Sequence, residues 1–227
     1  MTIHQPLSNE RPRTTQLTCL LAGLMLSLGA LAAAPQTAHK ENVVTLYAGY
    51  RDGGSFTDAT SGQTLRIDGS SAWAVSYDRE LDGSRQLQLY VSYQSTHLEL
   101  DQSAAANPLA GTLPAPLPMK VIYVHIGGTN FVDGPIGRGP YLVGGLGVTL
   151  FEPGSSGYSD ELRPSLNLGI GYQVPLGGNV ALRVEARGYA TLVKSSGGLF
   201  CSGGCVFKIK ADAVAQGEVQ LGLSYGF

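Results

Sequence analysis

The chain ends in the stretch QGEVQLGLSYGF, residues 216–227, whose two interleaved sets of positions differ in polarity. One set holds Val219, Leu221, Leu223, Tyr225 and Phe227, and the other holds Gln216, Glu218, Gln220, Gly222, Ser224 and Gly226. Because successive side chains of a β-strand point to opposite faces, the stretch predicts a strand with one apolar and one polar surface. The pattern continues to the final aromatic residue, which is typical of a strand that closes a membrane barrel.

Length and composition fit one all-β domain that is poor in charge. The chain has 227 residues, 31 glycines and 14% charged residues, and its net charge is −2. This length suits a single barrel domain. No basic patch interleaved with aromatic residues is present, so nucleic acid is not expected as a partner.

The N-terminal segment has the features of a secretory signal peptide. Arg11 and Arg13 precede an apolar run from Leu20 to Leu31, which ends in small residues. We expect cleavage after Ala32, because cleavage after Ala34 would leave a proline first. An uncleaved membrane helix is the alternative, but the run is short for one. The expected organisation is therefore a signal peptide at 1–32, a linker at 33–42 and a barrel at 43–227.

Removal of the signal peptide leaves two cysteines, Cys201 and Cys205, in the run CSGGC. Export permits a disulfide between them, and two free thiols are the alternative. A metal site is not expected, because the pair has no further cysteine or nearby histidine. We therefore predict a disulfide and no metal or other cofactor.

Eight segments of the mature chain have strand character, and most alternate apolar with polar or small residues. They are residues 43–51, 65–79, 85–97, 120–131, 141–151, 165–174, 179–193 and 215–227. About ten residues of a tilted strand cross the ~25 Å apolar band of an outer membrane, and the segments are about that long or longer. We expect the prolines after the signal peptide to lie between these segments, because proline cannot donate to a β-ladder.

The connections between the segments alternate in length. Short links follow the second, fourth and sixth segments, and longer links follow the others. Outer-membrane barrels show the same alternation, with short periplasmic turns and longer external loops. The pattern predicts an eight-stranded antiparallel transmembrane β-barrel with up-and-down topology. A soluble lipocalin-like barrel is the alternative, but it needs a charged exterior, whereas the polar faces here are mainly Gln, Ser, Gly and Asn.

With these features, the chain resembles the small outer-membrane β-barrel family that includes the OmpA-type transmembrane domain and the OmpX- and OmpW-type barrels. Its last strand looks like the signal read by the barrel-assembly machinery, carried by Leu221, Leu223, Tyr225 and Phe227. The resemblance implies a monomer in the bacterial outer membrane, with outer-membrane lipid and, during insertion, the assembly machinery as partners. The peptidoglycan-binding domain of the full OmpA-type architecture does not follow Phe227, so wall anchoring is not expected.

Four charged residues share the polar face of the last two predicted strands: Arg183, Glu185, Arg187 and Glu218. Buried charges must pair, so we predict an ion network in the lumen. Such a network could act as a gate or could fill and rigidify the interior, and we favour the second interpretation. The parity of Arg66 and Asp78 leaves open whether they join it.

Other polar and aromatic residues have simpler interpretations. Trp73, Tyr77, Tyr93 and Tyr172, with Tyr225 and Phe227, are expected in interfacial aromatic girdles. A lone inward histidine, His125, is expected to serve as an interior hydrogen-bonding group. The set Ser95, His97 and Glu99 resembles the polar rim of lipid A-modifying barrel enzymes, but a strand end meeting water explains it equally well. We therefore expect no catalytic residues.

Three functional classes remain open from the sequence. The first is a non-enzymatic barrel that acts in envelope structure or in surface interaction through its external loops, which we favour. The second is a narrow porin-like channel or an OmpW-like passage for small molecules. The third, a minor alternative, is a lipid A-modifying rim enzyme. The chain does not identify a ligand, because loops carry function on this fold.

Overall fold

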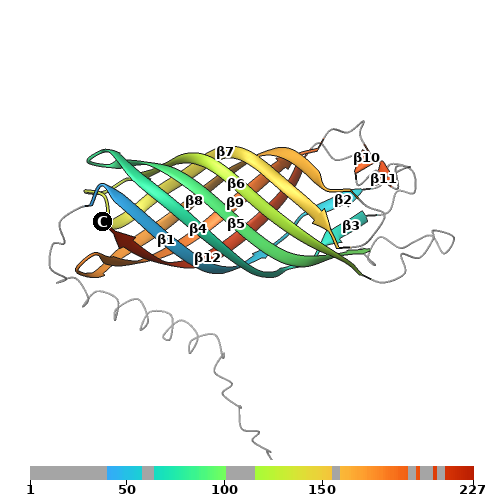
Figure 1. Cartoon of the computed structure of the whole chain (residues 1–227), viewed down its shortest axis with the longest axis horizontal. Coiled ribbons are helices and arrows are strands. Elements are labelled where there is room, and N and C mark those ends of the chain that lie inside the picture. The colour runs from blue at the N-terminus through green and yellow to red at the C-terminus, as the bar shows by residue number, and fades with distance from the viewer. Residues whose placement is uncertain are drawn as a thin grey trace, which may run out of the picture. The chain divides into compact units, whose positions relative to one another are not determined.

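The computed structural model describes residues 40–57, 64–100, 116–154, 159–193, 198–199, 207–208 and 213–227. Eight long strands in these ranges form a closed antiparallel barrel (Figure 1), which confirms the predicted fold class. They are β1 (Asn42–Asp52), β4 (Ser70–Asp82), β5 (Arg85–Leu100), β6 (Leu117–Phe131), β7 (Gly139–Pro153), β8 (Glu161–Gly177), β9 (Val180–Leu192) and β12 (Ala213–Gly226). Consecutive long strands pair with one another, and β12 returns to pair with β1.

Four further strands in the described ranges are short and lie outside this ring. β2 (Ser55–Thr57) and β3 (Thr64–Ile67) form a hairpin that pairs with the end of β5, and β10 (Gly198–Leu199) pairs with β11 (Phe207–Lys208). The segment predicted at 65–79 is therefore wrong as one strand. It breaks at Asp68, whose side chain accepts a hydrogen bond from the Gly69 amide.

The expectation that prolines lie between strands is also wrong. Five prolines fall inside strands: Pro118, Pro140, Pro153, Pro164 and Pro175. The strands extend beyond the predicted segments, so these prolines occupy strand ends, where a missing donor costs few ladder bonds. Pro175 also adjoins a register shift between Pro175 and Gly177, which is where a sheet tolerates proline.

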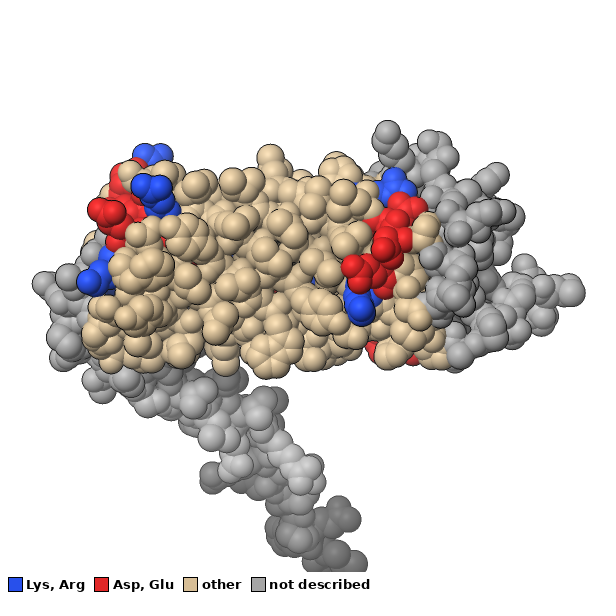
Figure 2. Space-filling view, viewed as in Figure 1, with Lys and Arg blue, Asp and Glu red and all other residues tan. Residues whose placement is uncertain are grey.

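The two faces of the wall differ in chemistry. Large apolar side chains point outward and are exposed, including Leu46 at 64%, Trp73 at 63% and Ile170 at 63%. In Figure 2, lysine, arginine, aspartate and glutamate gather toward the two ends of the barrel, and other residues form the broad band between. The described residues contain no helix long and apolar enough to cross a membrane. The sheet therefore presents its apolar side to its surroundings.

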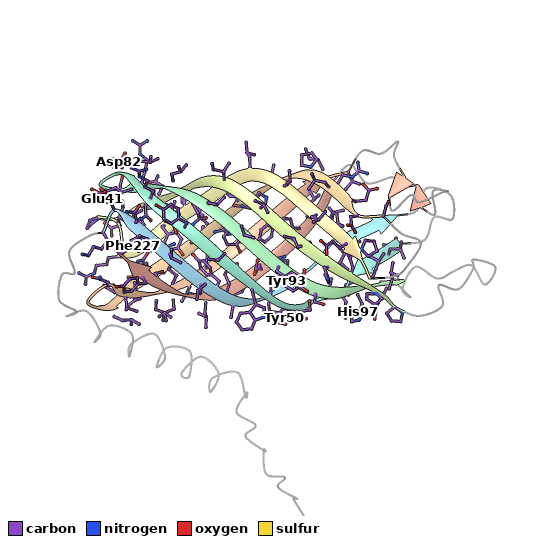
Figure 3. The ribbon with its side chains drawn as sticks, viewed as in Figure 1. Glu41, Tyr50, Asp82, Tyr93, His97 and Phe227 are labelled. Atoms are coloured by element: carbon purple, nitrogen blue, oxygen red, sulfur yellow. The ribbon has the colours of Figure 1, made fainter. Side chains whose placement is uncertain are left out.

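The two ends of the barrel differ in their connections. Glu41, Asp82 and Phe227 lie at one end and His97 lies toward the other (Figure 3). The first end carries the short β4–β5, β6–β7 and β8–β9 links and is called the turn end below. The opposite end is called the loop end.

The β4–β5 turn at the turn end is held by Asp82, and it gives a first prediction. The Arg85 side chain donates to Asp82, the amides of Ser84 and Arg85 also donate to it, and together they lower the pKa of Asp82 to about 2. Because these contacts favour the ionised carboxylate, Asp82 stabilises the folded turn at pH values above its ordinary pKa of ~3.9. This stabilisation is lost as the pH falls toward 2. In NMR titration the Asp82 carboxyl is expected to titrate near 2, and Arg85→Ala is expected to raise that midpoint. An ordinary midpoint in the parent protein would contradict this geometry.

Candidate functional site: the charged lumen

The inside of the barrel holds a charge-balanced set of buried ionic side chains. Arg183, Glu185, Arg187 and Glu218 all point inward, as their parity predicts, but they do not pair only with one another. Among the described residues, three ion pairs have both side chains fully buried: Arg51–Glu218 at 2.8 Å, Arg183–Asp78 at 3.1 Å and Arg187–Glu185 at 2.7 Å. Arg51 and Asp78 therefore complete the set, with three cations facing three anions.

Asp78 and Arg183 form the layer nearest the turn end. Asp78 accepts hydrogen bonds from Ser76 at 2.7 Å, Gln88 at 2.7 Å and Thr129 at 3.2 Å. Arg183 also donates to the Tyr47 hydroxyl at 3.2 Å and to Gln173 at 2.9 Å. Each charge is thus surrounded by polar groups, which a buried ion pair needs to offset its desolvation.

Arg187 and Glu185 form the middle layer, two residues apart on β9 (Val180–Leu192). The Arg187 guanidinium carbon lies 3.8 Å from the centre of the Tyr90 ring, close enough for a cation–π contact. Glu185 accepts hydrogen bonds from the Tyr141 hydroxyl at 3.0 Å and from Gln220 at 2.7 Å. This layer therefore joins four strands of the wall.

Arg51 and Glu218 form the layer nearest the loop end. Arg51 donates to Glu218 at 2.8 and 3.2 Å and also to the hydroxyl of Ser92. Its guanidinium lies 4.8 Å from each of the Tyr123 and Tyr189 rings, which stack on each other at 4.2 Å. The cation is thus held by charge on one side and by aromatic faces on the other.

Side chains from opposite walls meet across the lumen. In the barrel order β5-β4-β1-β12-β9, strands β5 and β9 lie four positions apart in a ring of eight. The Tyr90 and Tyr189 hydroxyls, one from each, are 2.9 Å apart, and Arg187 donates to Gln88 at 3.1 Å. The Tyr123 hydroxyl on β6 donates to Gln216 on the opposite strand β12 at 2.7 Å. Hydrogen bonds therefore span the diameter at several levels.

Clusters of buried apolar side chains lie inside the barrel on either side of these layers, toward its two ends. At the loop end the cluster includes Leu65, Ile67, Leu98, Met119, Val121, Phe151, Val193 and Val214. At the turn end Ile136, from the β6–β7 turn, folds inward against Phe131, Tyr141 and Val143. The described interior is therefore polar in the middle of the barrel, as predicted, whereas apolar side chains fill it toward the two ends, which the prediction of a polar interior missed.

The predicted girdle and assembly-signal residues all lie on the outer face. Trp73, Tyr77, Tyr93 and Tyr172 are exposed, as are Leu221, Leu223, Tyr225 and Phe227. Ser95, His97 and Glu99 are exposed on the outer face near the loop end. Among the described residues, no hydrogen bond joins their side chains to one another. His125 is buried and its Nε2 lies 2.9 Å from the Ser165 hydroxyl.

Some predictions fall outside the described residues. They are the signal peptide, with its cleavage after Ala32, and the Cys201–Cys205 disulfide. Within the described ranges, no group of three or more His, Cys, Asp or Glu side chains is placed to hold a metal ion. Arg66 lies outside the lumen and pairs with Asp52 at 3.3 Å, both half-exposed.

Comparison with known proteins finds similarity in fold rather than in sequence. No family model and no curated protein matches the chain. Neisserial surface protein A superposes with a TM-score of 0.51 at 16% identity, covering 82% of this chain and 97% of that one. The outer membrane protein AlkL, solved in DMPC lipid bilayers, superposes with a TM-score of 0.51 at 14% identity, covering 86% and 94%. The chain therefore has the fold of the small eight-stranded outer-membrane β-barrels that its sequence resembles.

Proposed function

We propose that this protein is an integral, non-enzymatic outer-membrane barrel with a closed lumen, acting in envelope structure or surface interaction through its loop-end connections. The turn end faces the periplasm in this proposal, because short turns lie on that side of outer-membrane barrels. The observation that best supports a closed lumen is the set of hydrogen bonds between opposite walls, which includes Tyr90–Tyr189 and Tyr123–Gln216.

The outer face supports placement in a membrane. Exposed Leu46, Trp73 and Ile170 belong to a wide outward apolar band, and a soluble protein rarely exposes so large an apolar surface. The soluble-barrel alternative needs the opposite arrangement, with the apolar face inside and charge outside. Cell fractionation tests this placement, and recovery of the mature chain in the soluble periplasmic fraction contradicts it.

The closed lumen gives a second prediction, which separates this proposal from the channel alternative. Purified protein refolded into planar lipid bilayers is expected to produce no stable single-channel steps, because side chains cross the lumen at several levels. An open porin added to the same bilayers serves as the positive control. The Lys120→Ala variant, which changes an exposed side chain, is expected to be equally silent. Reproducible steps from folded protein contradict a closed lumen and favour the narrow channel.

A further inference from the structure

The seam between β1 and β12 is the place where the barrel closes, and no turn sets its register. Its contacting residues are far apart in the chain: 167 positions for Arg51 and Glu218 and 179 for Thr45 and Ser224. By contrast, the short turns joining β4 to β5 and β8 to β9 constrain how those strands pair. The register of the seam must therefore be chosen by its side chains.

The outward side of the seam does not distinguish one register from another. The paired outward residues are Val44–Tyr225, Leu46–Leu223, Ala48–Leu221 and Tyr50–Val219. All are apolar, so a slip of two residues again places apolar beside apolar. A slip of one residue is already excluded by the alternation of the strand, because it would turn the inward side chains of one strand outward.

The inward side carries four pairs whose members complement each other in hydrogen bonding, size or charge. Thr45 and Ser224 share a hydrogen bond at 2.9 Å, and Arg51 pairs with Glu218 at 2.8 Å. Between them a large residue faces a glycine twice, in opposite senses: Tyr47–Gly222 and Gly49–Gln220. The Tyr47 ring covers Gly222 so closely that any Cβ at that position meets it, and a Cβ on Gly49 meets Gln220.

A slip of two residues in either direction breaks these pairings. In one direction Arg51 faces Gln220 and Glu218 faces Gly53; in the other Arg51 faces Gln216 and Glu218 faces Gly49. Either slip therefore separates a buried cation from its anion, at a cost far above that of any change on the outward face. Tyr47 loses its glycine in both cases and meets Ser224 or Gln220.

We propose that the inward pairs Thr45–Ser224, Tyr47–Gly222, Gly49–Gln220 and Arg51–Glu218 select the register in which the barrel closes. Of the three buried ion pairs, Arg51–Glu218 is the one that joins the two strands paired at the seam, because Arg183 and Asp78 lie on β9 and β4 and Arg187 and Glu185 both lie on β9. This inference does not depend on whether the lumen conducts.

Cysteine cross-linking on the outer face reads the register directly. In a Cys201→Ser/Cys205→Ser background, Ala48→Cys with Leu221→Cys reports the native register. Ala48→Cys with Leu223→Cys, or with Val219→Cys, reports the two slips. Directly opposite residues lie ~4.5–5.5 Å apart, within disulfide reach, whereas diagonal neighbours at ~7–8 Å are not.

The test compares Arg51→Glu, Glu218→Arg and the exchange of both. Each single substitution places two like charges opposite each other, so the ratio of native to slipped cross-link is expected to fall about tenfold or more. The double variant Arg51→Glu/Glu218→Arg again pairs opposite charges and is expected to restore the ratio. Lys120→Glu, which disturbs an exposed ion pair between β6 and β7, is expected to leave the ratio unchanged. Heat-dependent gel mobility confirms that each variant is folded.

Two outcomes overturn the proposal: single variants that fold with the parental ratio, or folded single variants with a lowered ratio that the exchange fails to restore. If the single variants do not fold but the exchange folds in the native register, the proposal is supported. If none of the three folds, Arg51→Gln keeps a long polar side chain and removes the charge. A rise in slipped cross-link for Arg51→Gln then supports the selection of register, and the parental ratio overturns it.

Discussion

Replacing Asp78 with alanine is expected to lower the free energy of unfolding by about 3–5 kcal/mol, the usual cost of leaving one member of a buried ion pair unpaired. Arg183 is fully buried, and its remaining hydrogen-bond partners, which are Tyr47, Gln173 and Gln86, are neutral. The change also removes the acceptor used by Ser76, Gln88 and Thr129, so several buried donors lose a bond at once.

Urea unfolding in lipid vesicles, followed by the fluorescence of the chain's one tryptophan, Trp73, measures the effect. The matched control is Lys120→Ala, because its ion pair with Glu152 spans 3.7 Å and both side chains are partly exposed. Exposed pairs contribute about 0.2–1 kcal/mol, so this control is expected to unfold near the parental urea concentration. The double variant Asp78→Ala/Arg183→Met is expected to recover part of the loss, because it removes the unpaired charge. Equal stability of Asp78→Ala and the parent contradicts the assignment of this pair as a structural element.

The position of Asp78 in the lumen could have been read from the sequence once the strand boundary was known. Trp73, Val75 and Tyr77 form an apolar alternate set, which places Asp78 on the opposite, inward face. The predicted segment 65–79 hid this parity, because it ran through the break at Asp68 as though it were one strand. Local hydrogen bonding by aspartate, rather than hydrophobicity, sets that boundary.

The contacts across the lumen could not be read from the sequence in the same way. Tyr90 and Tyr189 are 99 positions apart, and tyrosine suits either an interfacial girdle or a polar interior. Which tyrosines point inward depends on the parity of each strand, and which ones meet depends on the stagger of strands around the barrel. Period-two patterning and the alternation of connection lengths therefore predict the barrel, whereas the layers inside it follow from closure.

The wall between β6 and β7 is expected to be especially intolerant of added side chains. Gly127 lies directly opposite Gly145, and a Cβ on Gly127 overlaps the carbonyl oxygen of Gly144. Because that atom belongs to the backbone, the neighbouring strand itself must move. Gly127→Ala adds only one methyl group, but it is expected to destabilise the barrel by about 1–3 kcal/mol, the usual cost of overpacking.

The control is Gly217→Ala on β12, where an added Cβ meets nothing within 4 Å. Removing glycine from such a position reduces the freedom of the unfolded chain, so this control is expected to be neutral or to gain about 0.4–1 kcal/mol. Both variants add the same methyl group to a strand glycine, so intrinsic strand preference cannot explain a difference between them. The urea midpoints should therefore move in opposite directions or differ clearly. Equal midpoints contradict a close backbone approach at Gly127 and show that this position accepts a side chain as readily as Gly217 does.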